Sequence, residues 1–212
     1  VTVPCGAIPE SLAESELFGH ARGAYSGAHT ARSGLFVTAR GGTVFLDDVN
    51  DLSPALQAKL LDVLQRGRVR PVGSDEEIPV DVRVIAAANT ALEPLVSQRT
   101  FRPDLYYRLN VIHLRMPPLR ERRQDLAAMM VEFAGRHRAL YGLISGVDPD
   151  LLRHLEAYPF PGNIRELEHA VQRMLFAKTQ GDRLTLADWR AQAPTAPAEA
   201  APGLVAAQWQ RI

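Results

Sequence analysis

Two adjacent carboxylates follow a short apolar segment, and their position suggests metal-assisted chemistry. Asp47 and Asp48 end the run that begins at Thr43. If that run is a strand of a parallel sheet, both acids lie at its carboxyl edge, where open α/β sheets bind ligands. One carboxylate there can hold Mg²⁺ through water, and the other can orient an attacking water. A strand that simply ends in polar residues explains the same pattern, so the residues alone leave both interpretations open.

A second candidate is a loop of small residues, Gly23-Ala24-Tyr25-Ser26-Gly27-Ala28. Two glycines bracket one aromatic ring and one hydroxyl group. An aromatic residue at such a tip can serve as a contact point for a partner. The residues alone favour the simpler interpretation, a flexible surface turn.

Three arginines are candidates for contacting phosphate. Arg102 and Arg108 are six positions apart and can project from one short helix and its edge. Arginine clamps phosphate oxygens with a planar fork of donors, although solvated arginines or structural ion pairs are the simpler interpretation. Arg165 follows a turn in which Asn163 is the expected helix cap. A cation in the first turn opposes the helix dipole, which suggests a role outside the helix or an ordinary salt bridge.

The elements that position these residues follow from hydrophobic patterning. We predict a helix that starts at Ser53-Pro54 and ends at Gly67, with leucines along one face. The segment 80–89 starts as an alternating pattern and ends as an apolar run, which is typical of a central strand in a mostly parallel sheet. The other predicted strands are 43–47, 68–72 and 111–114.

From residue 124 onward the pattern is helical only, with predicted helices at 124–141, 148–157 and 163–179. The composition therefore indicates an α/β domain over residues 1–118 and a small all-α domain over 119–190. Residues 191–212 form a predicted linker, which is rich in Ala and Pro over 191–203.

Composition excludes several classes of protein. Lys+Arg and Asp+Glu balance at 24 each, which argues against non-specific nucleic-acid binding as the main activity. Cys5 is the only cysteine, so neither an internal disulfide nor a cysteine-rich zinc site can form. No apolar stretch approaches the ~20 residues of a membrane helix. We expect a cytoplasmic protein that does not contact the membrane, and the first residue, Val1, suggests a fragment or a processed chain.

The candidate segments occur together, and in this order, in the sigma-54 interaction domain of bacterial enhancer-binding proteins, a branch of the AAA+ ATPases. Further matches are Glu16-Leu17-Phe18-Gly19-His20, residues 82–89, and Pro117-Pro118-Leu119-Arg120-Glu121-Arg122. The resemblance covers residues 4–190. It implies a P-loop NTPase-type parallel sheet followed by a small all-α lid. The activity it implies is ATP hydrolysis in a ring, which remodels closed complexes of sigma-54 RNA polymerase.

The resemblance also implies roles for single residues. Asp47 and Asp48 match the Walker B pair, with Asp47 holding Mg²⁺ through water. Asn89 is similar to the sensor I residue, which detects the γ-phosphate. Arg102 and Arg108 match the arginines that reach the nucleotide of a neighbouring subunit.

For the remaining candidates, Arg165 resembles the sensor II arginine of the lid, and residues 23–28 match the loop that contacts sigma-54. The implied cofactors are ATP and Mg²⁺. The implied partners are the sigma-54 factor and further copies of the chain in a ring, by resemblance a hexamer. DNA is reached only through a C-terminal domain that this chain does not contain, in a regulator of the two-component response-regulator type.

The chain departs from the family pattern at three places. No G-x-x-x-x-G-K-[ST] motif occurs in the sequence, so we expect the first strand and the Walker A loop to lie upstream, and the chain alone to have no appreciable ATPase activity. Asp48 stands where the family has Glu, and Pro4 where it has an Asn that switches that Glu. In the contact loop, Tyr25 and Ser26 replace Phe and Thr and keep a ring and a hydroxyl.

Three hypotheses follow. The first is an ATP-driven remodelling domain that is incomplete in this chain. The second is a non-hydrolysing regulatory or binding module on a AAA+ scaffold, with Pro4 and Asp48 as signs of decay. The third is a AAA+ ATPase with a different client, against which the intact loop argues.

Overall fold

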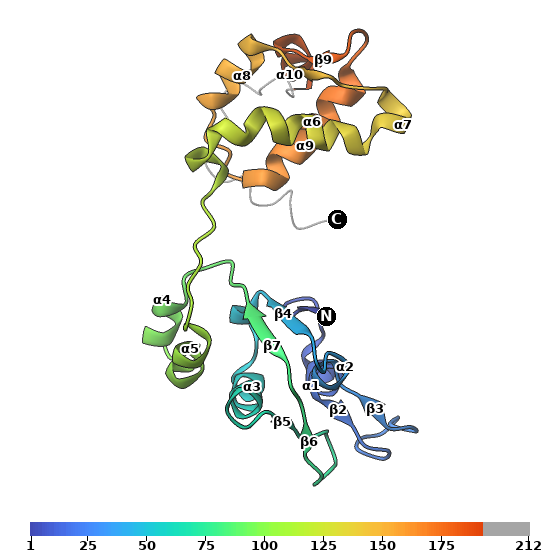
Figure 1. Ribbon diagram of the computed structural model, residues 1–212, viewed down its shortest axis with the longest axis vertical. Helices are drawn as coiled ribbons and strands as arrows, with labels where there is room; N and C mark the ends of the chain where they lie inside the picture. Colours follow the sequence, from blue (N-terminus) through green and yellow to red (C-terminus); the bar gives the residue numbers. More distant parts are fainter. Residues whose placement is uncertain (193–212) are drawn as a thin grey trace, which may run out of the picture. The chain divides into compact units, whose positions relative to one another are not determined.

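A three-stranded parallel sheet forms the frame of the first part of the chain in the computed structural model, which describes residues 1–192 (Figure 1). The strands are β1 (Thr2–Pro4), β4 (Thr43–Asp47) and β7 (Arg83–Ala86), and β4 lies between the other two. Both pairings are parallel, so the carboxyl ends of the strands meet at one edge. The sheet and its connecting helices confirm the predicted α/β class of this part.

Two compact units divide the chain, the first from Val1 to Leu114 and the second from Arg115 onward. The boundary set from the sequence, after residue 118, lies a few residues further along. Within the described residues, no helix is long and apolar enough to cross a membrane.

Short helices and two-stranded pairs complete the first unit. They are α1 (Glu10–Phe18), β2 (Gly19–His20), β3 (Arg32–Ser33), α2 (Leu35–Thr38), the 3₁₀ helix η1 (Val49–Asp51), α3 (Pro54–Arg66), β5 (Arg68–Val69), β6 (Ile78–Pro79), α4 (Leu92–Ser97) and α5 (Pro103–Leu109). Their apolar side chains pack with those of β1 and β4 into one core, in which Phe36 and Val44 are fully buried.

The predicted helix at 53–67 is confirmed as α3. Its buried residues Leu56, Leu60 and Val63 recur at helical spacing, which lets one face pack into the core. Gly67 ends the helix in the left-handed conformation at φ 63°, where a glycine carries no steric penalty. Ser53 occupies the capping position, but its side chain makes no capping hydrogen bond.

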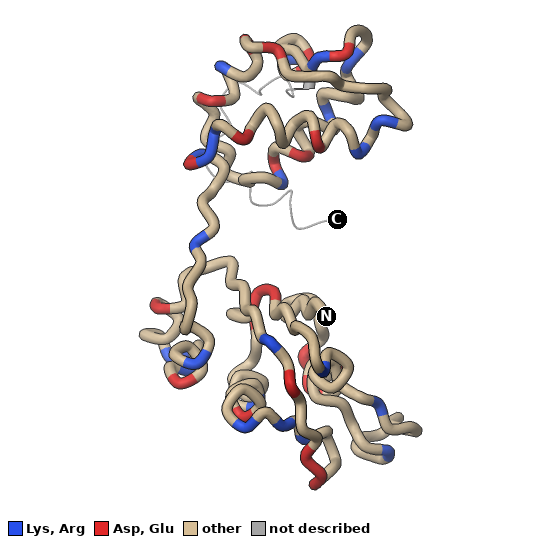
Figure 2. Tube along the Cα trace, in the orientation of Figure 1, with Lys and Arg blue, Asp and Glu red and all other residues tan. Residues whose placement is uncertain are grey.

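Two of the predicted strands are shorter than expected. The segment 68–72 pairs as a strand only at β5, and the segment 80–89 only at β7. β5 and β6 form an antiparallel hairpin instead. Acidic residues of this hairpin lie at its turn (Figure 2), and Glu77 there pairs with Arg70 at 2.9 Å.

The predicted strand at 111–114 is wrong. Val111, Ile112 and Leu114 are 78–81% exposed, and the segment pairs with no strand among the described residues. Three of its four residues are apolar, but a strand also needs a neighbour whose backbone groups complete the ladder. β7 is an edge strand of the sheet and does not supply that neighbour.

The second unit is built mainly from helices, as predicted. Its elements are the 3₁₀ helices η2 (Leu119–Glu121) and η3 (Arg123–Asp125), α6 (Leu126–Arg136), α7 (Arg138–Tyr141), β8 (Gly146–Val147), α8 (Pro149–Glu156), α9 (Asn163–Ala177), β9 (Arg183–Leu184) and α10 (Leu186–Gln192). Leucines and methionines of α6, α8 and α9 form its core, in which Met130, Leu155 and Met174 are fully buried.

The helix predictions for this unit agree with the structure at α8 and α9. The helix predicted at 124–141 is divided into η3, α6 and α7. His137 separates α6 from α7, since it leaves the helical conformation at φ −106° and ψ 13°. Of the predicted linker, Ala191 and Gln192 end α10, and residues 193–212 lie outside the described part.

Close backbone packing occurs where α1 meets α2. A Cβ atom on Gly34 would lie 2.3 Å from the carbonyl carbon of Phe18 and 2.4 Å from the nitrogen of Gly19. These are backbone atoms, which cannot rotate away. The φ of Gly34 is −77°, a value open to any residue, so space and not conformation requires glycine here.

We predict that Gly34→Ala destabilises the first unit by about 1–3 kcal/mol or more, because the added methyl group overlaps backbone atoms. The control is Gly135→Ala in α6, where a Cβ meets nothing within 4 Å and alanine favours the helix by about 0.5–1 kcal/mol. Calorimetric unfolding of both variants tests the pair. Equal melting temperatures for Gly34→Ala and the parent would contradict the packing argument.

Candidate functional site

Two acids lie at the carboxyl edge of the sheet, where the sequence placed them. Asp47 is the last residue of β4, directly beside Pro4 of β1, and its carbonyl accepts a hydrogen bond from the Cys5 N–H at 2.9 Å. Asp48 follows in the left-handed conformation at φ 54° and ψ 51°. A non-glycine residue in this region is uncommon, and such strained backbone concentrates at functional sites. The turn therefore holds two neighbouring carboxylates in a defined arrangement.

Asn89 is tied to this acidic turn through Asn50. The Asn89 N–H donates to Asn50 Oδ1 at 3.3 Å, and Asn50 Nδ2 donates to Asp51 Oδ1 at 2.8 Å. The backbone supports the link, since the Val49 N–H donates to the carbonyl of Ala87 at 2.9 Å. These hydrogen bonds join the segment after β7 to the turn after β4. The sequence analysis did not identify Asn50, whose only signal was its nearness to the two acids.

The electrostatic surroundings of the turn are acidic. Burial raises the pKa of the Cys5 thiol to about 11, and the negative charge of Asp47 adds to the effect. A thiol with that pKa stays protonated near neutral pH and is a poor nucleophile. Cys5 is therefore a buried apolar residue beside the site rather than a reactive group.

The donor set of the turn suits Mg²⁺. Carboxylate and amide oxygens are hard ligands, and Mg²⁺ in proteins is usually held by one or two carboxylates, with water and phosphate oxygens completing its shell. Within residues 1–192, no three His, Cys, Asp or Glu side chains gather closely enough to hold a metal by themselves. The geometry therefore fits an ion that arrives with a phosphate ligand.

Arg102 and Arg108 lie on one short helix, α5, as the sequence predicted. Arg102 is its capping residue and binds Asp104 with two hydrogen bonds, at 3.0 and 2.7 Å. The hydrogen bond from Arg102 lowers the pKa of the Asp104 carboxyl and raises that of the guanidinium. Arg108 donates to the carbonyl of Leu64, from Nη2 at 2.8 Å and from Nε at 3.3 Å. Both side chains are exposed and rest on local acceptors.

Gln57 holds the start of the arginine helix in place, and the sequence analysis missed it. Its side chain is 1% exposed. Nε2 donates to the carbonyls of Leu52 at 2.8 Å and Thr100 at 3.1 Å, and Oε1 accepts from the Arg102 N–H at 2.9 Å. The available signal was a polar residue on the buried face of an otherwise amphipathic helix.

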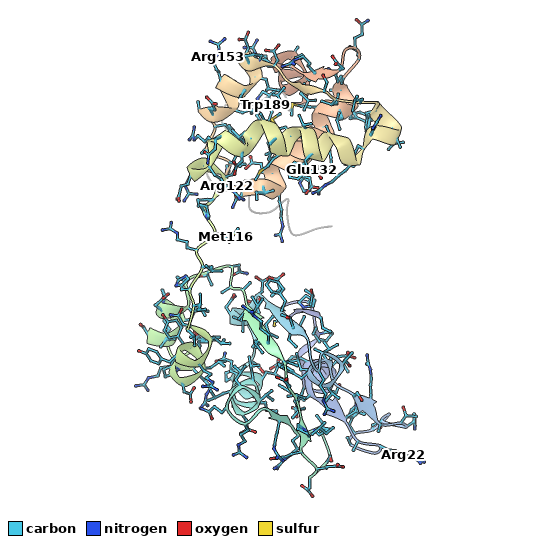
Figure 3. All side chains as sticks on the ribbon, viewed as in Figure 1. Arg22, Met116, Arg122, Glu132, Arg153 and Trp189 are labelled. Carbon is cyan, nitrogen blue, oxygen red and sulfur yellow. The ribbon has the colours of Figure 1, made fainter. Side chains whose placement is uncertain are left out.

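The loop at residues 23–28 is a closed turn with an exposed ring. Gly23 and Gly27 have φ of 81° and 104°, values that only glycine adopts freely. The Gly23 N–H donates to the carbonyl of Ala28 at 2.8 Å, which closes the loop. Tyr25 at its tip is 43% exposed. Figure 3 shows Arg22, which precedes the loop, projecting at the outer end of the β2 and β3 region.

Arg165 lies in the first turn of α9 in the second unit and is exposed. The expected cap is wrong, because Asn163 Oδ1 accepts from the backbone N–H of Leu119 at 2.8 Å and does not cap its own helix. Glu166 accepts from the N–H of Gly162, the residue just before the helix, at 2.7 Å. Glu166 also accepts from the Tyr158 hydroxyl at 2.8 Å, which raises the pKa of that phenol.

Both parts of the chain match known domain families. Residues 1–115 match the sigma-54 interaction domain, and residues 120–203 match the AAA+ ATPase lid domain. Among solved structures, NtrX from Brucella abortus in complex with ATP superposes with a TM-score of 0.77 at 32% identity, covering 89% of this chain and 43% of that chain. These matches confirm the predicted fold class and the resemblance.

Two transcription regulators are among the proteins whose sequences are similar to this chain. The hydrogenase transcriptional regulatory protein HoxA of Cupriavidus necator is 51% identical over 187 residues, which cover 87% of this chain. The anaerobic nitric oxide reductase transcription regulator NorR of Salmonella agona is 50% identical over 190 residues, which cover 88% of this chain. The chain spans 38% of the length of each regulator.

We predict that Gln57→Leu lowers the free energy of unfolding by about 1–3 kcal/mol, because it leaves one N–H and two carbonyls without their buried partner. Gln65→Leu is the control, since Gln65 lies on the exposed face of the same helix and such changes stay within about 0.5 kcal/mol. Calorimetry measures both. An unfolding transition for Gln57→Leu that matches the control would show that these hydrogen bonds contribute nothing.

Proposed function

Because this chain belongs to the family of sigma-54 interaction domains followed by a AAA+ lid, we propose that it forms the ATP-driven remodelling module of a sigma-54-dependent transcription regulator. The observation that supports the proposal most directly is the acidic turn at residues 47–48, joined through Asn50 to Asn89. The same unit also carries the arginine helix and the loop at residues 23–28. The proposal concerns the intact protein, meaning the complete product of its gene.

The nucleotide site lies at the carboxyl edge of the sheet. The solved relative NtrX contains ATP, and in this chain the same substrate, with Mg²⁺, supplies the phosphoryl group that is hydrolysed. Asp47 would hold Mg²⁺, which would neutralise phosphate charge there, and Asp48 would orient the attacking water. Asn89, fixed to the turn by Asn50, responds to the terminal phosphate, so a change at the nucleotide is passed to the segment after β7. Arg165 of the second unit is a further proposed nucleotide-binding residue, on its resemblance to the sensor II arginine.

Arg102 and Arg108 serve the nucleotide of a neighbouring copy in a ring. Both are exposed and held by weak local acceptors, a surface carboxylate and a helix-end carbonyl. Exposed ion pairs contribute little to stability, so either side chain can exchange its local acceptor for phosphate at low cost. A subunit that donates arginine to its neighbour requires a head-to-tail interface that closes into a ring.

The loop at residues 23–28 contacts the sigma-54 factor. Its ring is exposed, its glycines permit a change of shape, and it lies at the end of the β2 and β3 pair. The loop therefore couples the nucleotide cycle to the client and does not take part in hydrolysis. Contact with DNA requires a separate domain.

A non-hydrolysing module on the same scaffold is the second candidate. It is favoured by Pro4, which lies directly beside Asp47 and carries no side-chain donor. In the family pattern this position holds an Asn that switches the catalytic acid. ATP turnover by the intact protein separates the two candidates, since only the first hydrolyses ATP.

We predict that Tyr25→Ala in the intact protein keeps ATP turnover within about threefold of the parent and loses sigma-54 binding, because the ring contacts the client and not the nucleotide. Two measurements are needed: phosphate release, and sigma-54 retention with a transition-state analogue of ATP. Asp47→Ala is the reference that stops turnover. A parent without turnover would favour the non-hydrolysing candidate, and full sigma-54 binding by Tyr25→Ala would remove the loop from the contact.

We also predict that Arg102→Ala and Arg108→Ala each reduce turnover far more than nucleotide binding, by ~10³–10⁵-fold, the range found for arginine fingers in NTPases. Mixing either variant with Asp47→Ala should restore part of the turnover, since some interfaces then combine an intact acid with an intact arginine. Arg68→Ala, an exposed arginine of β5, is the control. If mixed rings assemble and recover nothing, the arginines do not act across the interface.

A further inference from the structure

His20 lies beneath the loop and is buried with one ring nitrogen unpaired. It ends β2, is 9% exposed, and its ring centroid lies 5.2 Å from that of Tyr25 at 59°. Of the buried side-chain nitrogen and oxygen atoms in residues 1–192, two have no hydrogen-bond partner, His20 Nδ1 and Arg122 Nε. A phenylalanine would fill the same space and keep the ring contact without an unpaired polar atom. Because nearly all buried polar atoms in proteins have a hydrogen-bond partner, the unpaired Nδ1 of His20 points to a role beyond packing.

The base of the loop is fixed around His20. His20 pairs with Arg32 across β2 and β3 and forms a bridge with Val72 of the neighbouring hairpin. A Cβ on Gly19 would lie 2.6 Å from the carbonyl oxygen of Arg32, so backbone packs on backbone here. The imidazole therefore cannot move far to find a partner.

The tip of the loop is open at both of its glycines, since a Cβ on Gly23 or Gly27 would meet nothing within 4 Å. Two hydroxyl groups lie between these glycines, on Tyr25 and Ser26, and both side chains are exposed. The tip therefore carries two hydroxyl donors that a change in its shape can bring to the fixed nitrogen.

We propose that His20 is a positioning residue for the loop, with Nδ1 as the acceptor for a tip hydroxyl, from Tyr25 or Ser26, in the arrangement that binds the client. The free protein leaves this acceptor unpaired, and engagement of the loop supplies its donor. The inference rests on the proposed function of the loop. A hydrogen bond to His20 would stabilise the client-binding shape of the loop relative to its free shape. Such a difference in free energy is what lets a ligand shift a conformation.

The test is His20→Phe in the intact protein. The variant keeps the aromatic contact with Tyr25 and removes the unpaired nitrogen, so its melting temperature should rise, by about 2–8 °C. Sigma-54 retention with the transition-state analogue of ATP should fall about tenfold, the equivalent of one lost hydrogen bond. A gain in stability joined to a loss of client binding is not expected of a residue with a purely structural role.

His20→Asn is the second variant, since its amide places a polar atom near the position of Nδ1, and it should bind sigma-54 more tightly than His20→Phe. Tyr25→Phe and Ser26→Ala identify the donor, because the one that supplies the hydroxyl should match the loss in His20→Phe. Trypsin cleavage after Arg22 reports whether the free loop keeps its shape, and it should not change in His20→Phe.

The outcomes separate this inference from the proposed function. If Tyr25→Ala loses sigma-54 and His20→Phe binds within twofold of the parent, the role of His20 is wrong and that of the loop stands. If Tyr25→Ala also binds normally, the proposed function of the loop fails. A lower melting temperature or faster cleavage after Arg22 in His20→Phe would show that the imidazole is structural and would overturn the inference.

Discussion

The parallel pairing of β4 with a strand on each side is the constraint on which the site depends. The Cys5 N–H donates to the carbonyl of Asp47 at 2.9 Å, and the Ala87 N–H donates to the carbonyl of Leu46 at 2.8 Å. These bonds fix the end of β4 between its two neighbours. A one-residue slip would turn every side chain of the strand to the opposite face. The buried positions Val44 and Leu46 oppose such a slip, and they thereby set where the acids lie.

Two polar side chains, Gln57 and Asn50, connect the end of β4 to other parts of the first unit. Gln57 connects the helix after β4 to the start of α5, and Asn50 connects the turn after β4 to the segment after β7. Gln57 is buried and supplies hydrogen bonds to backbone groups that water reaches poorly. The two acids, Asn89 and α5 are therefore joined by hydrogen bonds and short backbone segments. A shift of the turn after β4 can reach α5 through these packed, hydrogen-bonded groups.

Sequence patterns predicted the parts of this fold that depend on local periodicity. The strand at 43–47 and the helices α3, α8 and α9 each carry an apolar face that only one conformation can bury. The segment 111–114 has an equally clear pattern, yet it is exposed because no strand lies beside it. Whether a neighbouring strand is present depends on the tertiary structure. The residues of one segment do not reveal it.

The same distinction applies to the candidate site. The two acids and the two arginines were found from residue type and spacing. Gln57, Asn50 and His20 were missed as positioning residues, because their importance comes from the backbone groups or rings they meet across long sequence separations. Asn163 was assigned to its own helix, whereas its oxygen binds a backbone N–H that lies 44 residues away. The local capping rule therefore identified the right side chain, Asn163, but assigned it the wrong hydrogen-bond partner.

Two of the departures from the family pattern, Asp48 and Pro4, both lie beside Asp47 at the end of the sheet and concern the same carboxylates. Asp48 adopts φ 54°, a conformation that aspartate tolerates better than residues with longer side chains do. Its carboxylate is also shorter by one methylene than that of glutamate. Pro4, beside Asp47, offers no side chain that could hold or release either acid. The position of Asp48 is therefore set by the backbone of its own turn and by the link of that turn to Asn89. In the proposed nucleotide site, switching would come from movement of that turn as a whole, because Pro4 of β1 has no side-chain donor that can hydrogen-bond to the acid.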